Sequence, residues 1–143
     1  MSARERVYVD ACVLILAASA SEEDVAQRAL QELDRPDVEY VFSTLIEHEI
    51  LPNPIRNKRH EQVAFFQAYI GHAMKVACDE AQQVAALEMR INCPGLELVD
   101  ALHLSAAHDA GAVEFVTAEK LTKPMVASPP SFANGMTVRT IRV

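Results

Sequence analysis

Short apolar runs alternate with longer amphipathic segments along the chain. The β-rich runs cover residues 7–9, 38–42, 112–117 and 137–141, and they predict strands. Apolar residues recur at helical spacing in the segments between them: residues 12–20, 21–33, 44–51, two helices within 60–91, and 96–110. Short apolar strands that alternate with helices predict a single α/β domain over residues 1–143, in which helices flank both faces of a doubly wound parallel sheet.

Capping residues predict several helix boundaries. Ser21, which precedes three acids, is expected to start the second helix. Thr44 and Glu47 fit a capping box that would open the third helix, and the prolines within residues 52–54 would close it. Asp79 is expected to cap the second helix within 60–91. These boundaries decide which side chains lie at the ends of the strands.

The overall charge limits how the chain could bind nucleic acid. Its 143 residues carry a formal net charge of −7, which excludes binding through bulk electrostatic attraction. Contact with RNA would need a local basic patch or bound metal ions. The candidate RNA contacts form two groups: Arg56, Lys58 and Arg59 beyond the third helix, and Lys120 and Lys123 after the strand at 112–117. The first group is also typical of a solvated helix start.

Cysteine usage and the N-terminal segment indicate the compartment. The three cysteines are widely spaced and form no zinc-ligand pattern: Cys12, Cys78 and Cys93. They are expected to be reduced thiols in a cytoplasmic protein. Residues 18–20 resemble a signal-peptidase site, but Glu5 and Asp10 interrupt the basic and apolar regions that a signal peptide needs. The apolar run at 11–18 is too short to span a bilayer, so no membrane association is expected.

Carboxylates gather where the predicted strands end. In doubly wound sheets, sites form at the carboxyl ends of strands. The candidates are Asp10 after the first strand, Glu47 and Glu49 after the second, Asp100 within the helix at 96–110, and Glu119 after the strand at 112–117. The sequence therefore predicts that several acids meet at one edge of the sheet.

Each of these acids also has a structural alternative. Asp10 could simply cap the helix that follows it. Asp100 shares its helix face with Leu104 and Ala107, where a carboxylate is costly unless it is paired or bound to metal, and this favours a functional role. The capping box gives Glu47 a structural role, so Glu49 is the better site candidate.

A cluster of carboxylates restricts what the site could bind. Like charges repel one another, so a stable cluster implies bound protons or cations. Oxygen ligands suit Mg²⁺ or Mn²⁺, and such ions position phosphate groups and activate water for attack on a phosphodiester. An acidic protein could thus act on RNA if its metal ions supply the positive charge.

With these acids in order, the chain resembles the PIN domains of VapC-type toxin ribonucleases over almost its whole length. The family's first strand and its Asp resemble "VYVDACVLI", and its Glu before an apolar pair resembles "STLIEHEILP". The family's D-A-L-H-x-A-A helix is similar to "LVDALHLSAA", and its terminal T-x-D or T-x-E strand resembles "FVTAEK". By position, the resemblance implies a catalytic, metal-binding quartet of Asp10, Glu49, Asp100 and Glu119, supported by the Thr117 hydroxyl.

The resemblance also implies an activity and partners. The family's members are Mg²⁺- or Mn²⁺-dependent endoribonucleases that leave 5′-phosphate and 3′-hydroxyl ends. They usually form homodimers, and a small antitoxin protein occupies the acidic cleft. Two positions depart from the family: Glu119 stands where Asp is common, and Ala11 where a small hydroxyl residue is common. Glu119 could bind metal directly or through water, and it is the member of the quartet expected to use water if one of them does. Ala11 implies that one hydrogen bond near the metal is missing.

Two other functions are consistent with parts of the sequence. A PIN scaffold that binds RNA or a protein partner without cleavage would tolerate Ala11 and Glu119. A phosphorylated receiver domain is another acidic, Mg²⁺-binding α/β fold, and Lys123-Pro124 is similar to its Lys-Pro. A receiver needs paired acids after its first strand, however, and Asp10 stands alone. His103 is expected to be a satisfied structural histidine rather than a metal ligand, although contact with Asp100 is possible.

Overall fold

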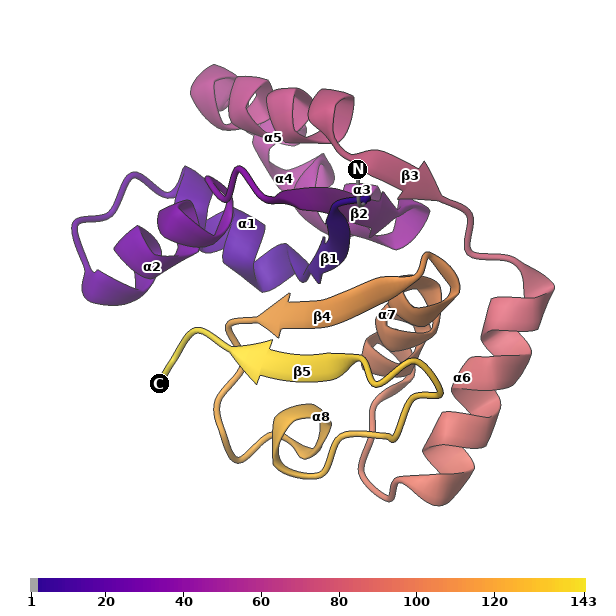
Figure 1. Cartoon of the computed structure of the whole chain (residues 1–143). Coiled ribbons are helices and arrows are strands. Elements are labelled where there is room, and N and C mark those ends of the chain that lie inside the picture. Colours follow the sequence, from indigo (N-terminus) through magenta and orange to yellow (C-terminus); the bar gives the residue numbers. More distant parts are fainter. Residues whose placement is uncertain (1–2) are drawn as a thin grey trace.

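Five strands form one parallel sheet in the order β3-β2-β1-β4-β5 (Figure 1). The computed structural model describes residues 3–143. The strands are β1 (Glu5–Val9), β2 (Val38–Ser43), β3 (Met74–Val76), β4 (Ala112–Thr117) and β5 (Thr137–Thr140). Their order excludes the receiver alternative, because receiver domains have the strand order 2-1-3-4-5.

Helices cover both faces of the sheet. The chain moves outward from β1 to β2 and β3, then crosses back to β4 and continues outward to β5. Because parallel crossovers are right-handed, this reversal places the two sets of helices on opposite faces. The first set is α1 (Ala11–Ala18), α2 (Asp24–Glu32), α3 (Thr44–Ile50), α4 (Pro52–Arg56) and α5 (His60–His72); the second is α6 (Glu80–Asn92), α7 (Leu98–Asp109) and α8 (Pro124–Ala127). The predicted doubly wound α/β fold is confirmed.

The core lies along β1, the central strand. Val7, Tyr8 and Val9 are all buried, because helices cover the sheet on both sides. The Tyr8 ring stacks on Phe115 of β4, with centroids 5.3 Å apart and an interplanar angle of 11°. Within residues 3–143, none of the helices is long and apolar enough to cross a membrane.

Three short elements were not predicted from the sequence: β3, α4 and α8. The edge strand β3 has three residues and pairs only with β2, so no alternating pattern develops along it. The helix α3 ends at Ile50, just before the prolines within residues 52–54 as predicted, and Pro52 then opens the short helix α4. A proline fits the first helical position because that N–H has no intrahelical partner.

The predicted caps are partly wrong. Asp79 caps α6 as expected, and its Oδ1 accepts a hydrogen bond from the Gln82 N–H at 3.0 Å. The capping box at Thr44 does not form: Ser43 is the N-cap residue of α3 and makes no side-chain cap. Glu47 instead forms an ion pair of 2.6 Å with Lys75 of β3, because a neighbouring strand offers it a full charge. The structural role predicted for Glu47 is therefore a tertiary one.

The start of the second helix is also shifted from its predicted position. The helix α2 begins at Asp24, with Glu23 as its N-cap residue. Ser21 lies before the helix, where its Oγ accepts a hydrogen bond from the Glu23 N–H at 3.1 Å. The serine thus forms a local turn and does not cap the helix.

A network of ion pairs joins β4 and β5 to the end of α2. Glu114 accepts hydrogen bonds from Arg35 and Arg139, both at 3.0 Å. Arg139 also forms a two-pronged pair with Glu32, at 2.8 and 2.9 Å. Partial burial opposes the ionisation of Glu114, but the two guanidinium groups outweigh it and hold its pKa below the ordinary value. The network therefore stabilises the folded state while Glu114 is ionised.

The variant Arg139→Met is expected to lower the free energy of unfolding at pH 7 by about 1 kcal/mol. It keeps much of the side-chain volume but removes both ion pairs. Since the Glu114 pKa is lowered by folding, its contribution is present above the ordinary glutamate pKa and is lost as pH falls through the folded value. Urea unfolding at pH 7 and pH 3 measures this. Arg56→Met on exposed α4 is the control, and an equal loss in both variants would contradict the prediction.

Candidate functional site

Asp10 and Thr117 lie at the point where the winding of the sheet reverses. The chain leaves β1 toward one face and leaves β4 toward the other, so the carboxyl ends of these two strands form the topological switch point, where doubly wound sheets bind ligands. The Asp10 N–H donates to the Val116 carbonyl at 2.8 Å, so the first residue after β1 is still aligned with β4. Asp10 after β1 and Glu119 after β4 are the two predicted acids that follow this pair of strands.

The Asp10 carboxylate is fixed by two hydrogen bonds. Its Oδ1 accepts from the Ala11 N–H at 2.9 Å, which caps α1. Its Oδ2 accepts from the Thr117 hydroxyl at 2.8 Å. Asp10 is only 6% exposed. The capping role and a site role are therefore compatible, because the cap uses one oxygen and leaves the other facing β4.

Cys12 takes part in this arrangement, which the sequence analysis did not foresee. Its Sγ lies 3.5 Å from Asp10 Oδ2 and 3.4 Å from Thr117 Oγ1. Burial, followed by the charge of Asp10, raises the pKa of the Cys12 thiol to about 12. The thiol is thus protonated and is a weak donor beside Asp10. The sequence analysis expected a hydrogen bond to be missing in this region because residue 11 is an alanine.

Asp100 lies in the first turn of α7 and is half-buried. Burial first, and then the negative charges of Asp10, Glu97 and Glu119, raise its pKa to about 6 against the opposing charge of Lys123. Asp100 is therefore close enough to Asp10 and Glu119 to be repelled by both. A bound cation would relieve this repulsion.

Glu119 follows β4 by two residues and is partly exposed. Its N–H donates to the Thr117 hydroxyl at 3.2 Å, so the same threonine contacts both Asp10 and Glu119. Glu119 lines a pocket of about 440 Å³ together with Lys120, Lys123 and Arg142. Positive side chains thus lie beside the acids on one side of the site.

Glu49 lies apart from these three acids in its contacts. It projects from α3 with 39% of its side chain exposed, and its Oε1 bonds to Nε2 of His103. His103 is 1% exposed, so it is the satisfied, buried histidine that was predicted. The histidine was considered a possible neighbour of Asp100, but its hydrogen bonds go to Glu49 and Tyr8.

The four acids do not form a closed metal cage. Among residues 3–143, no group of three or more His, Cys, Asp or Glu side chains is arranged to hold a metal ion. The donor chemistry still suits a hard divalent cation, since the neighbouring groups are carboxylates, and their charges add to burial in raising the pKa of Asp100. The quartet of Asp10, Glu49, Asp100 and Glu119 stays a prediction.

The two basic groups differ in their relation to the acids. Lys120 and Lys123 line the pocket that contains Glu119, and Arg142, which the sequence analysis missed, joins them. Arg142 also donates to the Ala118 carbonyl, which holds the C-terminal segment against the end of β4. The exposed residues Arg56, Lys58 and Arg59 lie at α4 and just beyond it, and Arg59 lines a different pocket with residues 60–62.

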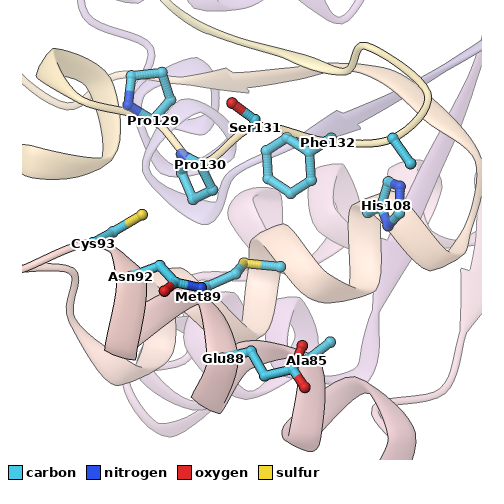
Figure 2. Close-up of a pocket in the computed structure, with 11 residues that line it drawn as sticks. Ala85, Glu88, Met89, Asn92, Cys93, His108, Pro129, Pro130, Ser131 and Phe132 are labelled. Carbon is cyan, nitrogen blue, oxygen red and sulfur yellow. The ribbon is translucent and has the colours of Figure 1, made fainter.

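A separate pocket of about 500 Å³ lies between α6, the end of α7 and residues 129–133 (Figure 2). His108 and Phe132 in its lining pack against each other, with ring centroids 5.4 Å apart. None of the four candidate acids lines this pocket. It is therefore distinct from the acidic site at the sheet edge.

Solved structures with a similar fold are toxins and toxin–antitoxin complexes. The chain is similar to VapBC2 from Rickettsia felis bound to a DNA fragment from its promoter, at 12% identity and a TM-score of 0.67, covering 94% of this chain and 98% of that one. A toxin–antitoxin complex from Klebsiella pneumoniae matches at 19% identity and a TM-score of 0.66, and the match covers 86% of this chain and 92% of that one. VapC20 from Mycobacterium tuberculosis, a sarcin-ricin loop cleaving toxin, matches at 15% identity and a TM-score of 0.63. This match covers 85% of this chain and 95% of that one.

At these identities the structural matches show the fold alone. No curated protein matches the chain. The family comparison is decisive: residues 7–121 match the PIN domain. This range contains Asp10, Glu49, Asp100 and Glu119 and covers most of the chain. The chain belongs to the PIN domain family.

Proposed function

We propose that the protein is a Mg²⁺- or Mn²⁺-dependent endoribonuclease and the toxin of a type II toxin–antitoxin pair. One observation carries the proposal: at the carboxyl ends of β1 and β4, the Thr117 hydroxyl bonds to both the Asp10 carboxylate and the Glu119 N–H. Burial and the neighbouring charges, that of Asp10 foremost, raise the pKa of Asp100 beside them, and a cation bound at this topological switch point would offset the repulsion. PIN domain membership supports nuclease chemistry at this position.

The residues would divide the work between binding the cation and binding RNA. Asp10, Asp100, Glu49 and Glu119 would hold the ion, which when bound lowers the pKa of water and neutralises charge on the phosphodiester. Asp10 is held for this role by the Ala11 N–H and the Thr117 hydroxyl. Lys120, Lys123 and Arg142 line one side of the site, where they would bind backbone phosphates of RNA.

The proposed partners follow from the similar structures. VapBC2 and the Klebsiella pneumoniae protein are toxin–antitoxin complexes, which supports a small antitoxin as the partner of this chain. VapC20 cleaves the sarcin-ricin loop, which supports RNA as the class of substrate. A homodimer and a cytoplasmic location are parts of the same proposal.

The test is cleavage of defined RNAs by the purified protein. Cleavage is expected with Mn²⁺ or Mg²⁺ and is expected to stop in excess EDTA, with 5′-phosphate and 3′-hydroxyl product ends. Full activity of a clean preparation in EDTA would overturn the proposal. RNA binding with no cleavage under either metal would favour the catalytically inactive PIN scaffold.

The two basic groups make different predictions for RNA binding. Lys120→Gln is expected to weaken RNA affinity about 3- to 10-fold and to reduce the slope of log affinity against log salt by about 1, because it removes one phosphate contact beside Glu119. Lys58→Gln, a matched exposed lysine on the other group, is expected to change affinity little. Fluorescence anisotropy at several salt concentrations measures both. A larger loss in Lys58→Gln would place the RNA on the other side.

A further inference from the structure

We infer that Tyr8 and His103 are positioning residues that hold the Glu49 carboxylate ready to bind the cation. Glu49 is the one of the four candidate acids that lies on α3, and its side chain is 39% exposed. A free glutamate side chain at such a position would lose rotamer freedom on binding an ion, and this loss would weaken binding. The inference rests on the proposed function, because it concerns the same site.

A chain of hydrogen bonds runs from the core to Glu49. The Tyr8 hydroxyl lies 2.8 Å from Ser43 Oγ and 2.7 Å from His103 Nδ1. His103 Nε2 then bonds to Glu49 Oε1. Ser43 and Tyr8 are fully buried and His103 is 1% exposed. Four elements (β2, β1, α7 and α3) thus fix the orientation of one carboxylate.

The chemistry of the groups gives the chain a direction. An ionised carboxylate only accepts hydrogen bonds, so His103 must carry its proton on Nε2. A neutral imidazole then presents Nδ1 as an acceptor, and the Tyr8 O–H donates to it. The Tyr8 oxygen in turn accepts from the Ser43 hydroxyl. Each group therefore donates once toward Glu49, and the Nε2–H tautomer of His103 is the one that the chain selects.

A purely structural role does not account for where the chain ends. Three buried polar side chains are costly in a core unless each is satisfied, and apolar residues would fill the same space. This chain ends on a partly exposed carboxylate whose second oxygen, Oε2, makes no hydrogen bond within residues 3–143. Tyr8 lies within electrostatic range of both Asp10 and Glu49, so the chain reaches the acidic edge. Histidines and carboxylates that orient metal ligands are arranged in this way.

Tyr8→Phe tests the inference without emptying the core. The ring that stacks on Phe115 is kept, and only the hydroxyl that bonds to His103 Nδ1 is lost. The Mn²⁺ affinity of the full chain, measured by electron paramagnetic resonance, is expected to fall about 3- to 10-fold. Tyr69→Phe is the matched control, because the Tyr69 hydroxyl has no hydrogen-bond partner among the described residues.

A double-mutant cycle separates positioning from general stability. If Tyr8 acts through Glu49, Tyr8→Phe is expected to leave Mn²⁺ affinity unchanged in a Glu49→Gln background. An equal loss of affinity in both backgrounds would overturn the inference. Absence of Mn²⁺ binding in the wild type would overturn the proposed function, whereas wild-type binding that Tyr8→Phe does not weaken would overturn the positioning role alone.

The tautomer of His103 is a readout that needs neither metal nor RNA. Nitrogen NMR of the metal-free protein is expected to show His103 protonated at Nε2, in the wild type and in Tyr8→Phe alike, because the Glu49 carboxylate accepts from this nitrogen. Protonation at Nδ1 in the wild type would overturn the inference.

Discussion

Replacing Asp10 with Asn is expected to lower the rate of RNA cleavage by at least about tenfold in Mn²⁺, with the fold intact. The substitution removes the negative charge at the switch point between β1 and β4. Asparagine still caps a helix well, so the bond from the Ala11 N–H survives through the amide oxygen. Single-turnover cleavage of a defined RNA measures the loss, and circular dichroism checks the fold.

The matched control for this variant is Asp79→Asn. Asp79 is also an N-cap aspartate, and it accepts a hydrogen bond from the Gln82 N–H at the start of α6. Unlike Asp10, it does not lie at the switch point between β1 and β4. Cleavage is expected to stay at the wild-type level, since only the cap is altered. Equal losses in the two variants would mean that Asp10 acts through capping alone, and full activity of Asp10→Asn would remove it from the site.

Asp100→Asn is expected to lower the rate of RNA cleavage as much as Asp10→Asn does. It is also expected to make the metal-free protein more stable at pH 7.5. Folding raises the Asp100 pKa to about 6, first through burial and then through the charge of Asp10. An acid whose pKa is raised by folding destabilises the fold at high pH, and this cost disappears as pH falls below its unfolded value. After allowance for solvent screening of a half-buried group, the gain is about 1 kcal/mol.

Thermal unfolding at two pH values and with metal measures this second prediction. In metal-free buffer at pH 7.5 the variant is expected to unfold roughly 3 °C higher than the wild type, and at pH 3.5 the difference should largely vanish. Mn²⁺ is expected to stabilise the wild type and to have little effect on the variant. Lower stability of the variant at pH 7.5 would contradict the electrostatic account of the site.

The fold could be predicted from the sequence because its strands are continuous apolar runs. The helices cover both sides of β1, so Val7, Tyr8 and Val9 are all buried and the strand is visible without alternation. The position of the acids followed from a general property of doubly wound sheets. Asp10 comes directly after β1 and Glu119 two residues after β4, so the carboxyl edge of two adjacent strands brings them close.

The errors concern choices that depend on distant neighbours. Glu47 could not be recognised as a partner of Lys75, because the strand that carries Lys75 has only three residues and leaves no pattern. The preference for Glu49 over Glu47 was argued from a capping box that does not form. Glu47 is nevertheless engaged elsewhere, and Glu49 is the one whose side chain meets the α7 helix through His103.

The hydrogen bonds that organise the site join residues far apart in the chain. Thr117 contacts both Asp10 and Cys12, which no local spacing could indicate. The family resemblance supplied the hydroxyl at Thr117, but Cys12 and the chain from Ser43 through Tyr8 to His103 became visible only with the strands placed side by side. Sequence patterns therefore placed Asp10 and Glu119 at the ends of two strands, and the tertiary structure shows that Thr117 bonds to both.

A crystal soaked in Mn²⁺ and measured at the manganese absorption edge tests the metal site most directly. The expected result is an anomalous peak at the carboxyl ends of β1 and β4, with oxygens of Asp10 and Asp100 about 2.1 Å away and Glu119 reached through a water. Direct ligation by Glu119 would correct its predicted role but keep the site. A crystal that diffracts well and shows no peak near Asp10 and Asp100 at saturating Mn²⁺ would contradict the proposed metal-dependent ribonuclease.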